Sequence, residues 1–225
     1  MPLKPRTRRR LAFVAGFVVY FSLLWTFWET VLVYPLKIFV VLLHELSHAI
    51  AAWATGGEVA YIVLNPRQGG ETGSRGGNPF LMLSAGYLGS LLWGVGLVRA
   101  AYWKRVHAGT VTGIIGVMVL ALTALVVRSQ FGVVFGVLFA LVLLACAWRL
   151  PDLWNRRLVL VLGMTSCLYA VLDIKSDILD RPTLQSDAAM LAELTGIPTL
   201  FWGVVWIAAA LTVCALLLRW AWRRA

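Results

Sequence analysis

The chain has 225 residues, of which 60% are hydrophobic and 13% are charged. A soluble domain has about 25% charged residues, because its surface faces water. The composition therefore excludes a soluble globular protein and predicts a single membrane domain over residues 1–225. The net charge of +10 does not indicate nucleic-acid binding, because the basic residues flank apolar segments, where the lipid bilayer is their partner.

A basic arm over residues 1–10 precedes the first of seven apolar segments. About twenty residues span the hydrocarbon core of a bilayer. We therefore predict an all-α polytopic membrane protein with six to seven transmembrane helices, six if one early segment fails to cross. The segments are approximately 11–28, 36–54, 79–98, 110–127, 131–148, 158–172 and 198–220.

Two connections are longer than the others. Residues 55–78 are rich in glycine, and residues 58–64 within them carry valine, tyrosine and isoleucine. This pattern predicts a membrane-associated β-hairpin after the second helix. The second connection, 173–197, is acidic. The three cysteines lie inside apolar segments without metal-ligand spacing, so we expect neither a disulfide nor a cysteine metal site.

The distribution of basic residues does not orient the chain by itself. If all seven segments cross, the 20 lysines and arginines divide equally between the two sides. A dense basic N-terminal arm usually dominates orientation. We therefore expect an integral multi-pass protein of the plasma membrane with its N-terminus in the cytoplasm.

The second segment contains the motif His44-Glu45-Leu46-Ser47-His48, which is H-E-x-x-H. Residues four apart share one face of a helix, so His44 and His48 can present two imidazoles to one metal ion. Glu45 lies beside them, where it can take a proton from a metal-bound water. Ionisable groups in the middle of an apolar helix each cost roughly 2.5–3.5 kcal/mol to insert, so this cluster indicates a metal site.

A catalytic zinc usually has three protein ligands and a water. Asp173, at the end of the sixth apolar segment, is the predicted third ligand because it is the most deeply placed acid, and Asp177 is the alternative. We interpret His107 as a solvated loop residue, and Asp180 and Asp187 as solvated or capping acids. If the third, fourth and fifth segments all cross, His48 and Asp173 approach the same membrane face, which is cytoplasmic when the N-terminus is inside.

These residues resemble the M50 metallopeptidases, the site-2 protease class of intramembrane zinc proteases, and are most similar to the M50B-like branch. The resemblance covers about residues 36–206, a metalloprotease-like core. Besides the H-E-x-x-H motif, it rests on the glycine-rich connection, on Ser84-Ala85-Gly86-Tyr87-Leu88-Gly89-Ser90, and on the late acidic stretch from Leu172-Asp173 to Ser186-Asp187-Ala188.

The resemblance implies one Zn²⁺ held by His44, His48 and a distant aspartate, with Glu45 as the general base that activates a zinc-bound water. In that class the aspartate usually precedes glycine, whereas Ile174 follows Asp173 here, so Asp173 and Asp177 stay open. The resemblance also implies that the strand 58–64 can pair with an unwound substrate, a membrane protein or peptide. It does not indicate the substrate-binding side chains or the oligomeric state.

Two other functions fit the same residues. A membrane transporter or metal-binding channel would use His44, His48 and Asp173 along a pathway. Its expected sign is ionisable residues spread over several spans, whereas here they concentrate in the second and sixth segments. A catalytically silent pseudoprotease would keep the fold to bind client proteins, although the intact Glu45 argues against it.

Overall fold

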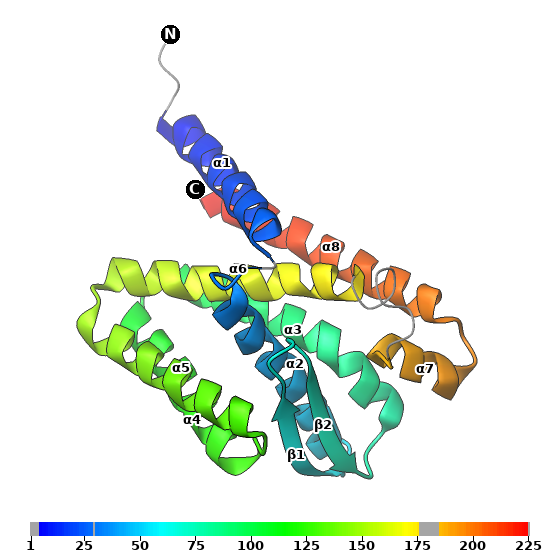
Figure 1. Cartoon of the computed structure of the whole chain (residues 1–225). Helices are drawn as coiled ribbons and strands as arrows, with labels where there is room; N and C mark the ends of the chain where they lie inside the picture. The colour runs from blue at the N-terminus through cyan, green and yellow to red at the C-terminus, as the bar shows by residue number, and fades with distance from the viewer. Residues whose placement is uncertain (1–4, 29, 176–184, 225) are drawn as a thin grey trace.

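The computed structural model describes residues 5–28, 30–175 and 185–224. In this part of the chain there are eight helices and one two-stranded sheet (Figure 1). The helices are α1 (Pro5–Thr26), α2 (Tyr34–Ala54), α3 (Pro79–Ala101), α4 (Ala108–Leu125), α5 (Gln130–Arg149), α6 (Asp152–Lys175), α7 (Asp187–Thr195) and α8 (Thr199–Arg224). The strands are β1 (Glu58–Leu64) and β2 (Gly70–Arg75).

Six of the described helices are long and apolar enough to cross a membrane: α2, α3, α4, α5, α6 and α8. In α1 the apolar part is the shorter stretch Arg10–Thr26. The predicted fold class, a polytopic all-α membrane protein with a small hairpin after the second helix, is confirmed. The hairpin is antiparallel, pairs Glu58 with Arg75 and Leu64 with Gly70, and shifts register between Val59 and Tyr61.

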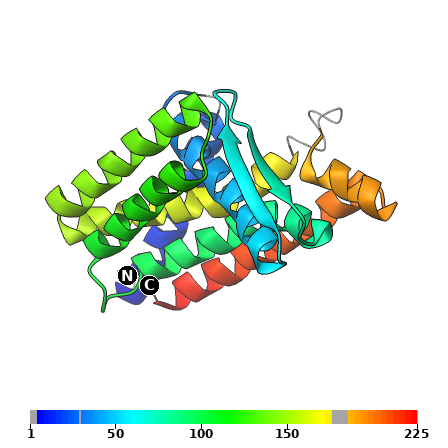
Figure 2. The same cartoon turned by 90° about the horizontal axis from the view of Figure 1, so that it is seen from below.

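The α2 helix is the most buried of the candidate spans and is inclined to its neighbours (Figures 1 and 2). Its first residue, Tyr34, donates to the carbonyl of Pro66 in the hairpin turn and packs on Phe131 in the first turn of α5. At its other end, the Thr55 hydroxyl accepts from the amide of Asn78, which caps α3. The first residue of α2 therefore lies near the hairpin turn and the start of α5, and its last turn lies near the start of α3.

Small residues let α3 and α6 approach closely, as in many membrane helix pairs. A Cβ on Gly94 would lie 2.7 Å from the amide nitrogen of Cys167 and 2.8 Å from the carbonyl of Gly163. Ser166 donates to the carbonyl of Ser90 across the same contact, at 2.6 Å. This glycine seam fixes α6 against α3, and α2 packs on α3 beside it.

The hairpin is fastened to the rest of the molecule through β1. The amide of Ile62 donates to the carbonyl of Val126 at 2.7 Å, and its carbonyl accepts from the amide of Arg128 at 2.9 Å. Leu64 bonds through its amide and its carbonyl to the hydroxyl of Ser129. The sequence-based expectation that β1 offers its backbone to a substrate is therefore wrong at Ile62 and Leu64, whose polar groups are already used.

Substituting Gly94 by alanine is expected to destabilise the protein by about 2 kcal/mol, because the methyl group would overlap backbone atoms that cannot move aside. The measurement is unfolding by heat or denaturant in detergent micelles. Gly96→Ala is the matched control: it lies on the same helix with open space around it, so it is expected to be neutral or to stabilise by up to about 1 kcal/mol. Equal stability of the two variants would contradict the conclusion that Gly94 is needed for α3 and α6 to pack closely.

Candidate metal centre

The two motif histidines lie on the face of α2 that meets α3. His44 and His48 each have an exposed fraction of 9%, and the Glu45 side chain between them has 4%. The ring of His44 packs edge-on against that of His48, with ring centroids 4.7 Å apart. The helical spacing thus brings both imidazoles to one place, as the motif predicts.

Contacts with α3 orient both imidazoles. His48 Nδ1 lies 2.7 Å from the carbonyl oxygen of Met82, to which a protonated Nδ1 can donate. That hydrogen bond leaves Nε2 as the nitrogen with a free lone pair, which is how histidine ligands are commonly prepared for a metal ion. The ring of His44 packs edge-on against Tyr87, at a centroid distance of 5.0 Å.

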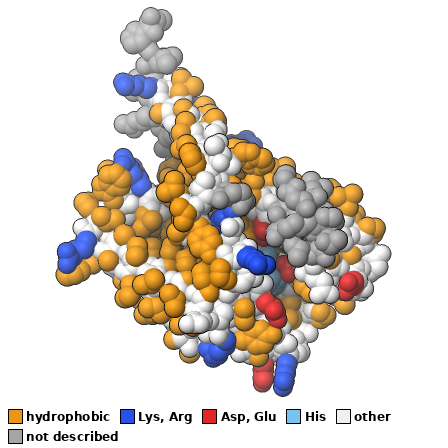
Figure 3. Space-filling model, viewed as in Figure 1, with side chains coloured by type: hydrophobic (Ala, Val, Ile, Leu, Met, Phe, Trp, Pro, Cys, Tyr) orange, Lys and Arg blue, Asp and Glu red, His pale blue; other side chains and the backbone are white. Residues whose placement is uncertain are grey.

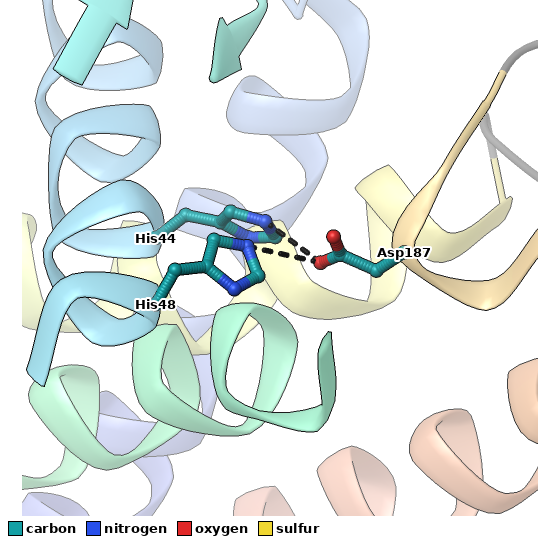
Figure 4. Close-up of side chains that lie close together, drawn as sticks. All are labelled: His44, His48 and Asp187. Atoms are coloured by element: carbon teal, nitrogen blue, oxygen red, sulfur yellow. Dashed lines mark ion pairs between the residues drawn. The ribbon is translucent and has the colours of Figure 1, made fainter. Parts of the chain in front are cut away.

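The third member of the cluster is Asp187, at the start of α7. Its Oδ2 lies 3.1 Å from His44 Nε2 and 3.2 Å from His48 Nε2 (Figure 4). Burial by itself raises the pKa of the Asp187 carboxyl, but the imidazoles of His48 and His44 outweigh burial and hold that pKa below its ordinary value. Asp187 therefore brings one carboxyl oxygen to both nitrogens.

The sequence of α7 explains how Asp187 comes to the histidines. Ser186 caps the helix by accepting from the amide of Ala189, and Gly196 ends it in a left-handed conformation with φ 73°. Ala188 and Leu191 are completely buried in a cluster with Tyr87 and Trp206. These apolar contacts dock α7 against α3 and α8, so the acid at its first position is buried beside α2.

The geometry of the three ligand atoms fits a metal ion. A tetrahedral zinc with ligands at 2.0–2.1 Å places neighbouring ligand atoms about 3.3 Å apart, close to the observed separations of Nε2 and Oδ2. The atoms of His44, His48 and Asp187 all lie within 4.8 Å of one another. His44 Nδ1 is buried without a hydrogen-bond partner among the described residues, and the buried Asp187 Oδ2 faces the two Nε2 atoms. Two imidazoles and one carboxylate are also a donor set that zinc accepts in hydrolases.

Glycine is required where α3 backs onto this cluster. A Cβ on Gly86 would overlap the Nε2 and Cε1 atoms of His44 and lie 2.6 Å from Asp187 Oδ2. Gly86 belongs to the stretch Ser84–Ser90, on which the family resemblance partly rests. The structure thus gives that stretch a physical reason: the α3 backbone itself forms one wall of the cluster.

Strand β2 holds Glu45 on the other side. The Thr72 hydroxyl lies 2.7 Å from Glu45 Oε2 and 3.0 Å from the backbone carbonyl of Glu45, and it can donate to either. A Cβ on Gly70 would overlap Glu45 Oε1, so glycine is needed for the strand to pass this close. The hairpin therefore restrains the carboxylate of Glu45 next to the histidines.

A pocket of about 1180 Å³ opens over the cluster. Figure 3 shows a recess in this face, with acidic side chains around it. Its lining comes from α2, the hairpin turn, β2, the first turns of α3, the last turns of α6, and α7. The polar and charged lining side chains are His44, Glu45, His48, Asn65, Arg67, Gln68, Glu71, Thr72, Tyr87, Tyr169, Asp173, Gln185, Ser186 and Asp187.

Among the described residues, the other candidate ligands do not join this group of three. Asp173, on the last turns of α6, lines the same pocket but is not part of the group of three that can hold a metal. Asp177 and Asp180 lie outside the described residues. His107 caps α4, and its side chain is 64% exposed, in agreement with its interpretation as a solvated loop residue.

The interpretation of Asp187 as a solvated or capping acid is wrong, because this residue is only 8% exposed. The depth of an acid within an apolar segment favoured Asp173 and could not reveal that a later short helix folds back. A usable signal was present in the sequence. Ser186 precedes Asp187 as a helix cap, and Ala188 and Leu191 are spaced as one apolar face.

The fold and the cluster together define a multi-span membrane protein with a buried His/His/Asp group on and beside an H-E-x-x-H helix. Comparison with known families agrees with this class: the model of the Peptidase M50B-like family matches residues 15–217. The chain therefore belongs to the Peptidase M50B-like family. No curated protein matches the chain, and no solved structure does.

Proposed function

We propose that the protein is an intramembrane zinc metalloprotease that hydrolyses peptide bonds of membrane-embedded substrates. One observation carries the proposal. Two imidazole nitrogens of the apolar helix α2 converge with one carboxylate oxygen of α7, and Glu45 of α2 lies beside them. Membership of a peptidase family supports it, as does the pocket over the cluster.

The proposed ligands of one zinc ion are His44, His48 and Asp187. Asp187 replaces Asp173 and Asp177 in this role because its Oδ2 lies within 3.2 Å of both imidazoles. When bound, zinc lowers the pKa of a coordinated water and polarises a carbonyl oxygen. His48 is held for this role by its contact with the carbonyl of Met82.

Glu45 is the proposed general base. Its carboxylate takes a proton from the attacking water and passes it to the nitrogen of the departing amine, so the proton count balances over the reaction. Thr72 positions the carboxylate by donating to Oε2, which leaves Oε1 as the oxygen free of that contact. The Thr72 hydroxyl thus restricts the rotation of the base.

The proposed substrate is an extended peptide segment. A transmembrane helix shields its own carbonyls by internal hydrogen bonds, so a substrate must unwind locally before it can be cut. Strand β2 is placed to receive the unwound segment, because Gly70 and Thr72 lie against Glu45 and line the pocket. Pairing with β2 would place substrate carbonyls next to the base.

The same proposal places the chain in the plasma membrane as an integral multi-pass protein with the start of α1 on the cytoplasmic side. The basic residues of the N-terminal arm support this side. Its substrates are then membrane proteins or peptides that share the bilayer with it.

Purified wild-type protein is expected to contain one zinc ion per chain, measured by elemental analysis after dialysis. His44→Ala and Asp187→Ala should lose it, because each removes one of three ligands. Asp173→Ala is the matched control from the same pocket and should keep it. If Asp173→Ala or Asp177→Ala loses zinc while Asp187→Ala keeps it, the third ligand is Asp173 or Asp177 and not Asp187.

Glu45→Gln is expected to keep zinc and the fold but to lower kcat by at least about 100-fold, because the amide cannot accept the proton. The assay is cleavage of a single-span reporter peptide, with a fluorophore at each end, in proteoliposomes. Wild-type activity in Glu45→Gln would refute the protease proposal. An inactive wild type that still holds zinc would identify a pseudoprotease.

Thr72→Val is expected to lower kcat by at least about tenfold in the same assay, with zinc content unchanged, since a hydrogen bond to a charged group is worth roughly 1.5–3 kcal/mol. Thr72→Ser restores the hydroxyl and should recover most of the activity. If valine and serine at this position behave alike, the hydroxyl does not position Glu45.

A further inference from the structure

The α1 helix meets the rest of the protein along one stripe of side chains. Every third or fourth residue belongs to this stripe, which places its members on one face of the helix. They are Arg10, Phe13, Phe17, Tyr20 and Leu24. All five are buried or half-buried, whereas every other residue from 11 to 26 is exposed. The stripe is therefore the face of α1 that contacts the protein.

Two contacts hold the stripe to different helices. The Tyr20 hydroxyl lies 2.5 Å from the Thr165 hydroxyl in the middle of α6 and 3.2 Å from the carbonyl oxygen of Val161. Near the start of α1, the Arg10 guanidinium lies over the ring of Trp222 of α8, at 5.3 Å from the ring centroid. Figure 1 shows the two helices beside each other there. The helix α1 is thus fixed to α6 at one point and to α8 at another.

Between these two contacts, a slot of about 40 Å³ lies between α1 and the helices α3, α6 and α8. Its lining includes Phe13, Phe17, Val98, Met164, Leu217 and Ala221. A cavity holds water only where it offers polar partners, and this lining is almost wholly apolar. The volume admits about three groups of the size of a methylene. The slot therefore fits part of one hydrocarbon chain.

Two arginines stand beside the slot. Arg10 comes one turn before Phe13 on α1, and Arg99 follows Val98 on α3 and lies 5.5 Å from the ring centroid of Trp220 of α8. Neither arginine has an ion-pair partner in the part of the chain that the structure describes. Arg10 Nε is also buried without a hydrogen-bond partner among the described residues. Because a buried donor without an acceptor is costly, an acceptor from outside the chain is expected here.

The aromatic side chains around these arginines indicate the headgroup level of a bilayer. Tyr102, at the end of α3, packs on Trp220 at a centroid distance of 5.5 Å, and Trp222 follows on α8. Tyrosine and tryptophan concentrate at membrane–water interfaces. Cys214, which also lines the slot, comes eight residues before Trp222, about 12 Å along the axis of α8. The slot therefore runs from the headgroup level into the hydrocarbon layer.

We propose that the slot binds one anionic phospholipid, with an acyl chain between α1 and the three helices behind it and the lipid phosphate at Arg10 and Arg99. Guanidinium groups form charge-assisted hydrogen bonds with phosphate. Basic side chains at the membrane surface also attract anionic lipids. The lipid phosphate supplies the acceptor that Arg10 Nε lacks within the described residues, and the acyl chain fills the slot beside Phe13 and Phe17.

This lipid site is separate from the metal centre. No residue that lines the slot also lines the pocket over His44, His48 and Asp187. The proposal therefore does not rest on the proposed protease function, and its tests need no activity.

The first test is native mass spectrometry of the full-length protein in detergent, titrated with phosphatidylglycerol or with phosphatidylcholine of the same acyl chains. One phosphatidylglycerol is expected to bind at least about fivefold more tightly than phosphatidylcholine, because each arginine near the membrane surface adds about that factor for an anionic lipid. Arg10→Gln and Arg99→Gln should each weaken phosphatidylglycerol binding about fivefold for the same reason.

Arg105→Gln is the matched control for these variants, because Arg105 is an exposed arginine just beyond the end of α3 and does not line the slot. This variant should keep the affinity of the wild type. Gel filtration checks that each variant folds. Equal affinity of the wild type for the two lipids would overturn the proposal, and so would an equal loss in Arg105→Gln and Arg10→Gln.

The second test uses the unsubstituted chain, so it does not depend on the folding of a variant. Cys214 lines the slot, whereas Cys146 is a half-buried thiol on α5 outside it. Phosphatidylglycerol at ten times its Kd is expected to slow alkylation of Cys214 by N-ethylmaleimide about tenfold, because only the lipid-free protein reacts. Alkylation of Cys146 should not change. Peptide mass spectrometry measures both rates, and equal rates for Cys214 with and without the lipid would refute the site.

Discussion

The constraint that the rest of the structure meets is the burial of three ionisable side chains, His44, Glu45 and His48, within one apolar helix. Charged and polar groups in such surroundings are costly unless each has a partner. The partners come from three directions: the Met82 carbonyl on α3, the Thr72 hydroxyl on β2 and the Asp187 carboxylate on α7. The hairpin and the short α7 helix are thus as much a part of the site as the motif itself.

Glycine residues let the backbones that carry these partners approach α2 closely. Gly86 lets α3 pass beside His44, and Gly70 lets β2 pass beside Glu45, because any side chain at either position would overlap the side chain of His44 or Glu45. The glycine seam at Gly94 then fixes α6 against α3 and sets the far wall of the pocket. Glycines that suggest only helix packing in the sequence therefore also shape the cluster.

The helices and the two histidines of the cluster could be predicted from the sequence, whereas the third member of the cluster could not. Apolar length located the helices, because spanning a bilayer requires a minimum run of residues, and i,i+4 spacing located His44 and His48. The position of Asp187 depends on the docking of α7 through Ala188 and Leu191 onto Tyr87 and Trp206, a long-range contact that local pattern does not encode. The contacts of Tyr34 with Phe131 and Pro66, which position the start of α2, are likewise long-range and are not encoded in the pattern of apolar segments.

The three side chains of the cluster do not belong to equally secure parts of the molecule. His44 and His48 stand on a helix enclosed by the main hydrophobic core, whereas Asp187 stands on a nine-residue helix held by two completely buried side chains. A metal ion bound by all three side chains would link the hydrophobic core to α7. Affinity for the ion and the docking of α7 are then two measures of one equilibrium, so a substitution far from the ligands, such as one at Leu191, would change both together.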